Sequence, residues 1–213
     1  MTTSALLKCG AWAGPIFVVT FLIEGATRAD YSALRHPVSL LALGEFGWIQ
    51  VLNFFITGVL SLAFAIGLRR ALRPAFWGSF LIGLVAVSGV ASGIFTSDPI
   101  NGYPPGTPLL PMQTTEGMLH ALSGLPVIFA WPIACGLVGR RFWQLGQRGW
   151  AIYSVVTAIA MVVTAGLLVL GISQTNLALS EVAGAFQRLS LILGFAWTTL
   201  VAHHLMRSLP DQR

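Results

Sequence analysis

The sequence predicts an all-α membrane protein, a bundle of six transmembrane helices in a single domain that covers residues 1–213. Of these residues, 55% are hydrophobic and only 9% are charged, whereas about 25% of the residues in a soluble domain are Asp, Glu, Lys or Arg. So few charges exclude a soluble enzyme, a disordered segment and a coiled coil. The second observation is that six stretches reach the length of about 20 mostly apolar residues that a helix needs to cross the bilayer core.

The first three spans follow the apolar runs of the N-terminal half. Residues 8–26 form the first span, and because no small-residue cleavage site follows it, we expect it to be retained as a helix. Residues 48–68 form the second span. Residues 75–97 form the third, in which Gly89 and Gly93 make a GxxxG pair that lets a neighbouring backbone approach closely.

The last three spans lie in the C-terminal half. Residues 117–138 form the fourth span, and its two prolines, Pro126 and Pro132, are expected to kink it and free carbonyl groups. Residues 150–172 and 184–206 form the fifth and sixth spans. The connection before the fourth span holds five of the 11 prolines (Pro99, Pro104, Pro105, Pro108 and Pro111). We expect it to be stiff and extended, and able to cover the end of the bundle.

The charges of the loops predict the orientation. Nine basic residues fall on one side of the bilayer, and six of the seven acids fall on the other with only three basic residues. Since cytoplasmic loops are enriched in Lys and Arg, both termini are expected in the cytoplasm. The net charge of +5 then reflects topology, and no nucleic-acid partner is expected. The nine basic residues on the cytoplasmic side are Lys8, Arg69, Arg70, Arg73, Arg140, Arg141, Arg148, Arg207 and Arg213, and the acid on that side is Asp211. The three basic residues on the opposite side are Arg28, Arg35 and Arg188. The six acids there are Glu24, Asp30, Glu45, Asp98, Glu116 and Glu181.

Strong polar side chains converge on the outer end of the predicted bundle. Ionisable groups inside a bilayer are costly, so they usually face a partner or a cavity. Five of the six spans deliver such a group to this level, and a loop covers the same level. We therefore expect an outward-facing polar site. Its candidate residues are Glu24, His36, Ser39, Asn53, Asp98, His120, Gln187 and Arg188.

Several arrangements of these groups remain open. Arg188 is expected to pair with Glu24 or Asp98, because an unpaired buried charge is expensive. Asp98 and His120 are candidate catalytic residues, as an acid–base pair or, together with His36, as zinc ligands. No metal-binding or nucleophile-elbow motif supports one option over another, so the metal and any cofactor stay undetermined.

Short motifs in these regions follow an order that is typical of one family. They are Pro37-Val38-Ser39-Leu40-Leu41, Gly47-Trp48-Ile49-Gln50, Asn53-Phe54, Gly58, Gly93-Ile94-Phe95, Asp98-Pro99, Gly117 with His120, and Gln187-Arg188-Leu189. In this order they resemble the prokaryotic integral membrane family known as domain of unknown function 998, over about residues 10 to 205. The resemblance implies a six-helix protein of the plasma (cytoplasmic) membrane and points to the same outer residues. It implies no reaction.

Two functions are compatible with these features. The first is a membrane-embedded enzyme that acts on a lipid or another amphiphile, with Asp98 and His120 in the chemistry and the other candidate residues holding the substrate. The second is a non-catalytic ligand-binding, sensory or accessory membrane protein. A small transporter is less favoured, because no charged groups lie near the middle of the spans. The lipid bilayer is the expected partner, and the oligomeric state stays undetermined.

Overall fold

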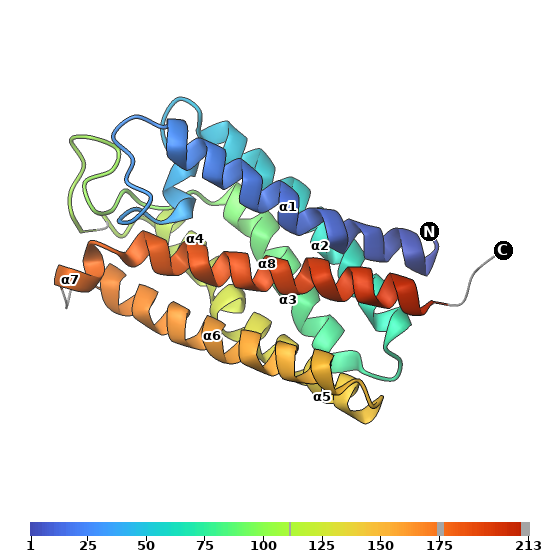
Figure 1. Ribbon diagram of the computed structural model, residues 1–213. Coiled ribbons are helices and arrows are strands. Elements are labelled where there is room, and N and C mark those ends of the chain that lie inside the picture. The colour runs from blue at the N-terminus through green and yellow to red at the C-terminus, as the bar shows by residue number, and fades with distance from the viewer. Residues whose placement is uncertain (111, 174–176, 210–213) are drawn as a thin grey trace.

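The computed structural model describes residues 1–110, 112–173 and 177–209, and throughout this part of the chain the regular secondary structure is helical (Figure 1). Six helices are long and apolar enough to cross a membrane, which confirms the predicted six-helix all-α fold. They are α1 (Thr3–Thr27), α2 (Gly47–Ala71), α3 (Phe76–Ile94), the continuous stretch Thr115–Gln144, α6 (Arg148–Ile172) and α8 (Ala183–Ser208). Two shorter elements, η1 (Val38–Ala42) and α7 (Leu177–Ser180), lie in the loops.

The fourth span has three parts. It consists of α4 (Thr115–Leu125), a π-helical turn η2 (Pro126–Ala130) and α5 (Trp131–Gln144). Proline has no N–H to donate, so the regular ladder breaks at Pro126. The Trp131 N–H instead donates to the Pro126 carbonyl, five residues back. The prolines thus produce the predicted interruption, in the form of a π-helical turn.

Small residues and aromatic rings hold the bundle together. Helix α1 packs on α2 and α8, α2 packs on α3, and α6 packs on α5 and α8. A Cβ on Gly89 would lie 3.4 Å from the Cα of Gly58, so the backbones of α2 and α3 meet closely there. At the centre of the bundle the Phe195 ring lies 4.7 Å from that of Phe17 and 5.0 Å from that of Trp131, measured between centroids.

The proline-rich connection before α4 folds back on itself, so the prediction of an extended loop is wrong for its described part. The Asn101 N–H donates to the Leu109 carbonyl at 2.9 Å. Ile100 and Tyr103 are buried, and the Tyr103 ring packs against that of Tyr31 with 5.2 Å between centroids. Local hydrogen bonds and aromatic packing therefore outweigh the stiffness of the prolines. Pro111 lies outside the described residues.

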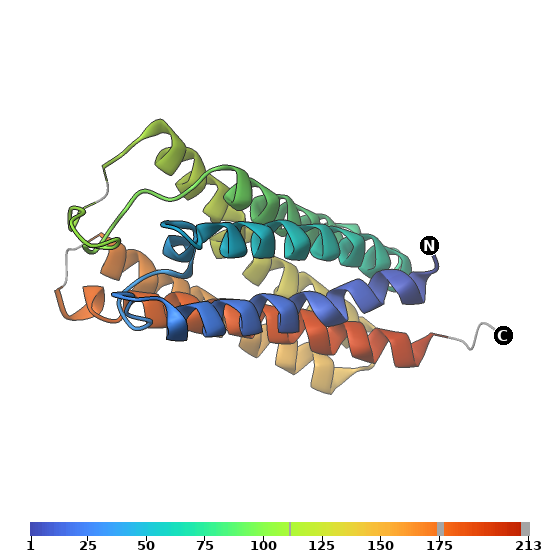
Figure 2. The ribbon, with the colours of Figure 1, turned by 90° about the horizontal axis from the view of Figure 1, so that it is seen from above.

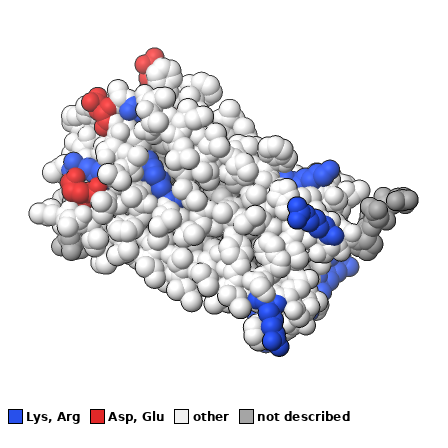
Figure 3. Space-filling view, viewed as in Figure 1, with Lys and Arg blue, Asp and Glu red and all other residues white. Residues whose placement is uncertain are grey.

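Charge separates along the length of the bundle. The start of α1 and the end of α8 lie at one end, where the visible surface carries Lys and Arg (Figures 1 and 3). The acidic side chains in the same view lie at the opposite end, with the long loops (Figure 3). This end is called the loop end below. Arg213 and Asp211 lie outside the described residues. The separation agrees with the charge pattern of the sequence, and the cytoplasmic location of the termini stays a prediction.

Candidate functional site

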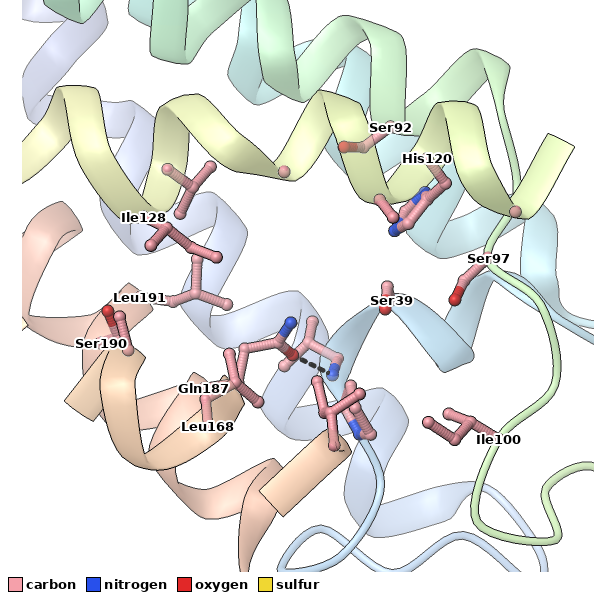
Figure 4. A pocket seen from close by; sticks show the side chains of 18 of the residues that line it. Ser39, Ser92, Ser97, Ile100, His120, Ile128, Leu168, Gln187, Ser190 and Leu191 are labelled. Carbon is pink, nitrogen blue, oxygen red and sulfur yellow. Dashed lines mark hydrogen bonds between the residues drawn. The ribbon is translucent and has the colours of Figure 1, made fainter. Parts of the chain in front are cut away.

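A cavity of about 320 Å³ lies in the half of the bundle nearest the loop end. Helix α4 forms one wall, and α6 and α8 form the facing wall (Figure 4). Of the eight candidate residues, four line this cavity: Ser39, Asp98, His120 and Gln187. The other four do not line it and make contacts within the fold; they are Glu24, His36, Asn53 and Arg188. The cavity therefore brings together residues from η1, α4, α8 and the segment that follows α3.

His120 lines the cavity, and within the described chain only one of its two ring nitrogens makes a hydrogen bond. Its Nδ1 lies 2.8 Å from the Phe95 carbonyl oxygen. A carbonyl only accepts, so Nδ1 carries the hydrogen and donates it, and Nε2 of the neutral ring keeps its lone pair. The contact also ties α4 to the end of α3. His120 is thus oriented by the backbone and leaves an acceptor available in the cavity.

Asp98 fixes the start of α4. Its two carboxylate oxygens accept from the Thr114 N–H at 2.9 Å and from the Thr114 hydroxyl at 2.6 Å. The Thr114 oxygen in turn accepts from the Gly117 N–H at 3.0 Å, as a helix N-cap does. Within the described chain no hydrogen bond joins Asp98 to His120. The carboxylate therefore positions the helix that carries His120.

A second carboxylate also joins the end of α3 to the start of α4, but this one is carried by α4 and accepts from a residue that follows α3. Glu116, in the first turn of α4, accepts from the Thr96 N–H at 3.0 Å and from the Thr96 hydroxyl at 2.7 Å. The end of α3 and the start of α4 thus exchange carboxylate contacts. Together they fix the position of α4, in which no residue is fully buried.

Gln187 and Ser39 supply polar atoms from the facing side of the cavity. The Gln187 Oε1 accepts from the Val38 N–H at 2.5 Å, the interaction drawn as a dashed line in Figure 4. This contact holds η1 against α8 and leaves the amide NH₂ of Gln187 free to donate. In the part of the chain that the structure describes, the Ser39 hydroxyl also makes no hydrogen bond. Both groups are therefore available to a ligand.

The deeper walls of the cavity are mostly apolar. They are formed by side chains of α2, η2, α6 and α8, which place hydrocarbon on several sides of the space. These residues are Phe54, Val127, Ile128, Leu168 and Leu191, with Ser190 as a polar side chain among them. The site thus has a polar end near the loops and an apolar interior.

Arg188 is buried and fastens the loop after α1 to α8. Its Nη1 donates to the carbonyls of Ala33 at 2.6 Å, His36 at 2.8 Å and Gly184 at 3.1 Å. Its Nη2 donates to the Tyr31 hydroxyl. Burial raises the pKa of Tyr31 to about 12, against the opposing effect of the Arg188 charge, so this phenol stays protonated.

The predicted pairing of Arg188 with Glu24 or Asp98 is wrong. Glu24 pairs instead with Arg28, one helical turn along α1, at 2.8 Å, and Asp98 is held by Thr114. Arg28 also donates to the Leu43 carbonyl at 3.0 Å. Backbone carbonyls satisfy Arg188 without a carboxylate.

His36 and Asn53 also act within the fold. His36 Nδ1 accepts from the Ser32 N–H at 3.0 Å, so the hydrogen is on Nε2, which faces the Asn101 carbonyl at 3.4 Å. Burial lowers the pKa of His36, and this favours the neutral ring that the contacts require. Asn53 is buried between α1 and α2, where its Nδ2 donates to the Phe17 carbonyl at 3.2 Å. Neither side chain lines the cavity.

The zinc alternative lacks its ligand set. Among the residues placed by the structure, no three His, Cys, Asp or Glu side chains form a group that could hold a metal ion. His36 is committed to Ser32 and the 101 carbonyl, and Asp98 to Thr114. The residues present do not fit a metal at this site.

Sequence reasoning missed the serine contacts that tie α3 to α4. Ser88 donates its hydroxyl hydrogen to the Ser123 carbonyl, and the Ser92 and Ser123 hydroxyls lie 3.1 Å apart. The signal was present as two serines four residues apart, on one face of the third span. Ser190, from α8, also lines the cavity, and a serine in an apolar span gave no separate indication of it.

Comparison with known proteins identifies a family and leaves the activity open. Searches of curated proteins and of solved structures give no match. A family model described as "Protein of unknown function (DUF998)" matches residues 11–204. This range includes all four candidate residues of the cavity and most of the six long helices. The chain therefore belongs to the DUF998 family of proteins of unknown function.

Proposed function

We propose that this membrane protein binds an amphiphile, a lipid or a molecule of similar build, in the cavity between α4 and the α6–α8 wall. The observation that carries the proposal is the division of this cavity into a polar end and an apolar interior. Its volume of about 320 Å³ falls within the range of about 300–1,000 Å³ that is usual for ligand pockets. A molecule with a polar head and a hydrocarbon chain matches both parts.

The position of α4 favours entry of the ligand from the side. Every residue of α4 is at least partly exposed, and α4 diverges from α6 and α8 towards the loop end (Figure 2). Ala121, on the cavity wall, is exposed. A wall of this kind faces the bilayer, so an amphiphile can reach the cavity between α4 and α6 without passing through water. With the predicted orientation, the ligand comes from the outer leaflet.

Catalysis on the bound amphiphile is the second candidate function. The tautomer of His120 is set by the Phe95 carbonyl, which leaves Nε2 able to accept a proton from a substrate or a water molecule. Ser39 has an uncommitted hydroxyl on the same cavity. In the described chain Asp98 makes no hydrogen bond to His120, whose Nδ1 is held by the Phe95 carbonyl in place of the orienting carboxylate of a catalytic triad. Binding therefore ranks above catalysis.

Photo-crosslinking tests the binding proposal. Purified protein is irradiated with long-chain amphiphiles that carry a photoreactive group in the chain, and the modified peptides are mapped. We expect labels on the segments of α4, α6 and α8 that line the cavity. A Cβ on Gly124 would meet nothing within 4 Å, so Gly124→Phe can fill the cavity and is expected to reduce this labelling at least tenfold.

The matched control is Gly166→Phe. Gly166 is an exposed helical glycine with equal space around its Cβ, and it does not line the cavity. This variant should label as the wild type does. Labelling that is unchanged in Gly124→Phe, or absent from the cavity peptides of the wild type, overturns the proposal. Conversion of the amphiphile by the wild type but not by His120→Asn would establish the catalytic alternative.

A further inference from the structure

We infer that the ligand of this cavity has an uncharged head group that carries a hydroxyl, as in a long-chain alcohol or a monoacylglycerol. This inference rests on the proposed function, because it assigns the ligand class of the same cavity. It follows from the charges that surround the polar end and from the hydrogen-bonding atoms that remain free there.

Among the described residues, neither Lys nor Arg lines the cavity. Its ionisable residues, among those that the structure describes, are Asp98 and His120. A phosphate or carboxylate head would lie beside the Asp98 carboxylate with no Lys or Arg to balance it. Proteins recognise such anions with charge-assisted hydrogen bonds, most often from Arg. The lining therefore disfavours an anionic head group.

The arginines nearest to the loop end are already engaged. Arg188 is buried and donates to three carbonyls and a phenol hydroxyl. Arg28 pairs with Glu24 at 2.8 Å. The remaining one, Arg35, faces Glu181 at 3.6 Å and does not line the cavity. To bind an anion, Arg188 would have to leave buried carbonyls without a donor, which is unfavourable.

A quaternary ammonium head group is disfavoured as well. It has no N–H to donate to the Asp98 oxygens, which already accept from Thr114. Recognition of a quaternary ammonium commonly relies on several aromatic faces. Phe54 is the only aromatic side chain in the described lining besides the imidazole of His120.

The free atoms fit a hydroxyl. The His120 Nε2 accepts, the Gln187 NH₂ donates, and the Ser39 hydroxyl does either. These three residues lie around the cavity from different elements (Figure 4). A ligand hydroxyl can donate to His120 or accept from Gln187, and it can do either with Ser39. Each of these contacts forms without a net charge on the head group.

The test compares two photoreactive probes with the same chain, a long-chain alcohol and the corresponding alkyl phosphate, at neutral pH. We expect the alcohol to label the cavity peptides at least tenfold more efficiently than the phosphate. His120→Asn keeps an N–H donor for the Phe95 carbonyl, but its amide oxygen is too short to reach the position of the cavity acceptor Nε2. It should weaken alcohol binding about tenfold, which corresponds to 1.4 kcal/mol, or about one hydrogen bond.

The outcomes separate the two proposals. Equal or stronger labelling by the phosphate, lost in Gly124→Phe, overturns the uncharged head group and leaves amphiphile binding intact. Cavity labelling by neither probe overturns both. Alcohol labelling that persists at full strength in His120→Asn removes His120 from the head-group contact and overturns the inference as well. Unchanged circular dichroism of His120→Asn provides the control for folding.

Discussion

Arg188 shows how a single buried side chain can organise a loop. One guanidinium reaches carbonyls at positions 33, 36 and 184, and therefore joins the connection after α1 to the start of α8. Its planar fork of donors suits several fixed acceptors at once. Because η1 follows this loop directly, Arg188 acts on the cavity through the position of Ser39 and not by touching a ligand.

Removing Arg188 should be strongly destabilising. Arg188→Ala leaves buried carbonyls without a donor, so the free energy of unfolding should fall by about 3 kcal/mol. Arg35→Ala is the matched control, since its side chain is 32% exposed and its distance to Glu181 is 3.6 Å. That variant should lose less than about 1 kcal/mol. Denaturant titration in mixed micelles measures both, and equal losses would contradict the assigned role of Arg188.

The lowered pKa of His36 predicts that the free energy of unfolding depends on pH. Burial, reinforced by the nearby charges of Arg35 and Arg188, lowers its pKa in the folded protein below the ordinary 6.5, while Glu181 and the Asn101 carbonyl oppose the shift. The unfolded chain then binds the proton first as the pH falls. Stability contributed by neutral His36 is complete above about pH 6.5 and decreases below it.

Thermal melts over this pH range measure the effect of His36. The other histidines titrate too, so the informative quantity is the difference between wild type and His36→Gln. We expect the melting temperature of the wild type to fall further than that of His36→Gln as the pH is lowered. A variant that loses just as much would show that another group is responsible.

At the scale of the element, α4 is the least embedded helix at the loop end. Its position depends on Asp98 and Glu116, which exchange contacts with Thr114 and Thr96, and on the serine contacts to α3. The adjoining face of the helix borders the cavity, and His120 belongs to both faces. The hydrogen bonds to α3 therefore hold α4 in place beside the cavity.

Two glycines of α4 should respond in opposite directions to alanine. A Cβ on Gly117 would overlap the Asp98 carboxylate and displace it from Thr114, which should cost about 2 kcal/mol in the free energy of unfolding. A Cβ on Gly124 meets nothing within 4 Å, so Gly124→Ala should gain about 0.8 kcal/mol from helix propensity. Denaturant titration of both variants checks the pair. Both glycines lie on the cavity face of α4, so a loss in both would mean that this face tolerates no added side-chain volume.

The helices could be predicted from the sequence because a span is a local property of about 20 residues. The predicted third span, residues 75–97, runs beyond the end of α3 at Ile94, since Phe95 is extended and the residues after it bind α4. The partners of Arg188 could not be predicted in the same way. They are backbone carbonyls more than 150 positions away in two cases, and a carbonyl leaves no residue signature.

At the scale of the whole molecule, the cavity follows from unequal packing along the bundle. Helices α1, α2, α3, α6 and α8 pack pairwise, and the fourth span joins them closely through α5 but diverges through α4 (Figure 2). The π-helical turn at Pro126 lies between these two parts. The divergence occurs at the loop end, where acidic side chains gather (Figure 3). The side of the membrane on which the cavity lies therefore depends on the orientation of the chain.

Cysteine labelling can determine this orientation. Cys135 is fully buried, so a Cys9→Ser background should be unreactive towards a membrane-impermeant maleimide. On intact cells, Met112→Cys at the loop end should react, because Met112 is 62% exposed. Gln144→Cys, exposed at the end of α5 near the basic residues, should react only after the membrane is permeabilised. The excess of Lys and Arg at that end predicts this result, since such loops stay in the cytoplasm. The reverse pattern would place the cavity in the inner leaflet, and the ligand would then have to come from the cytoplasmic side of the membrane.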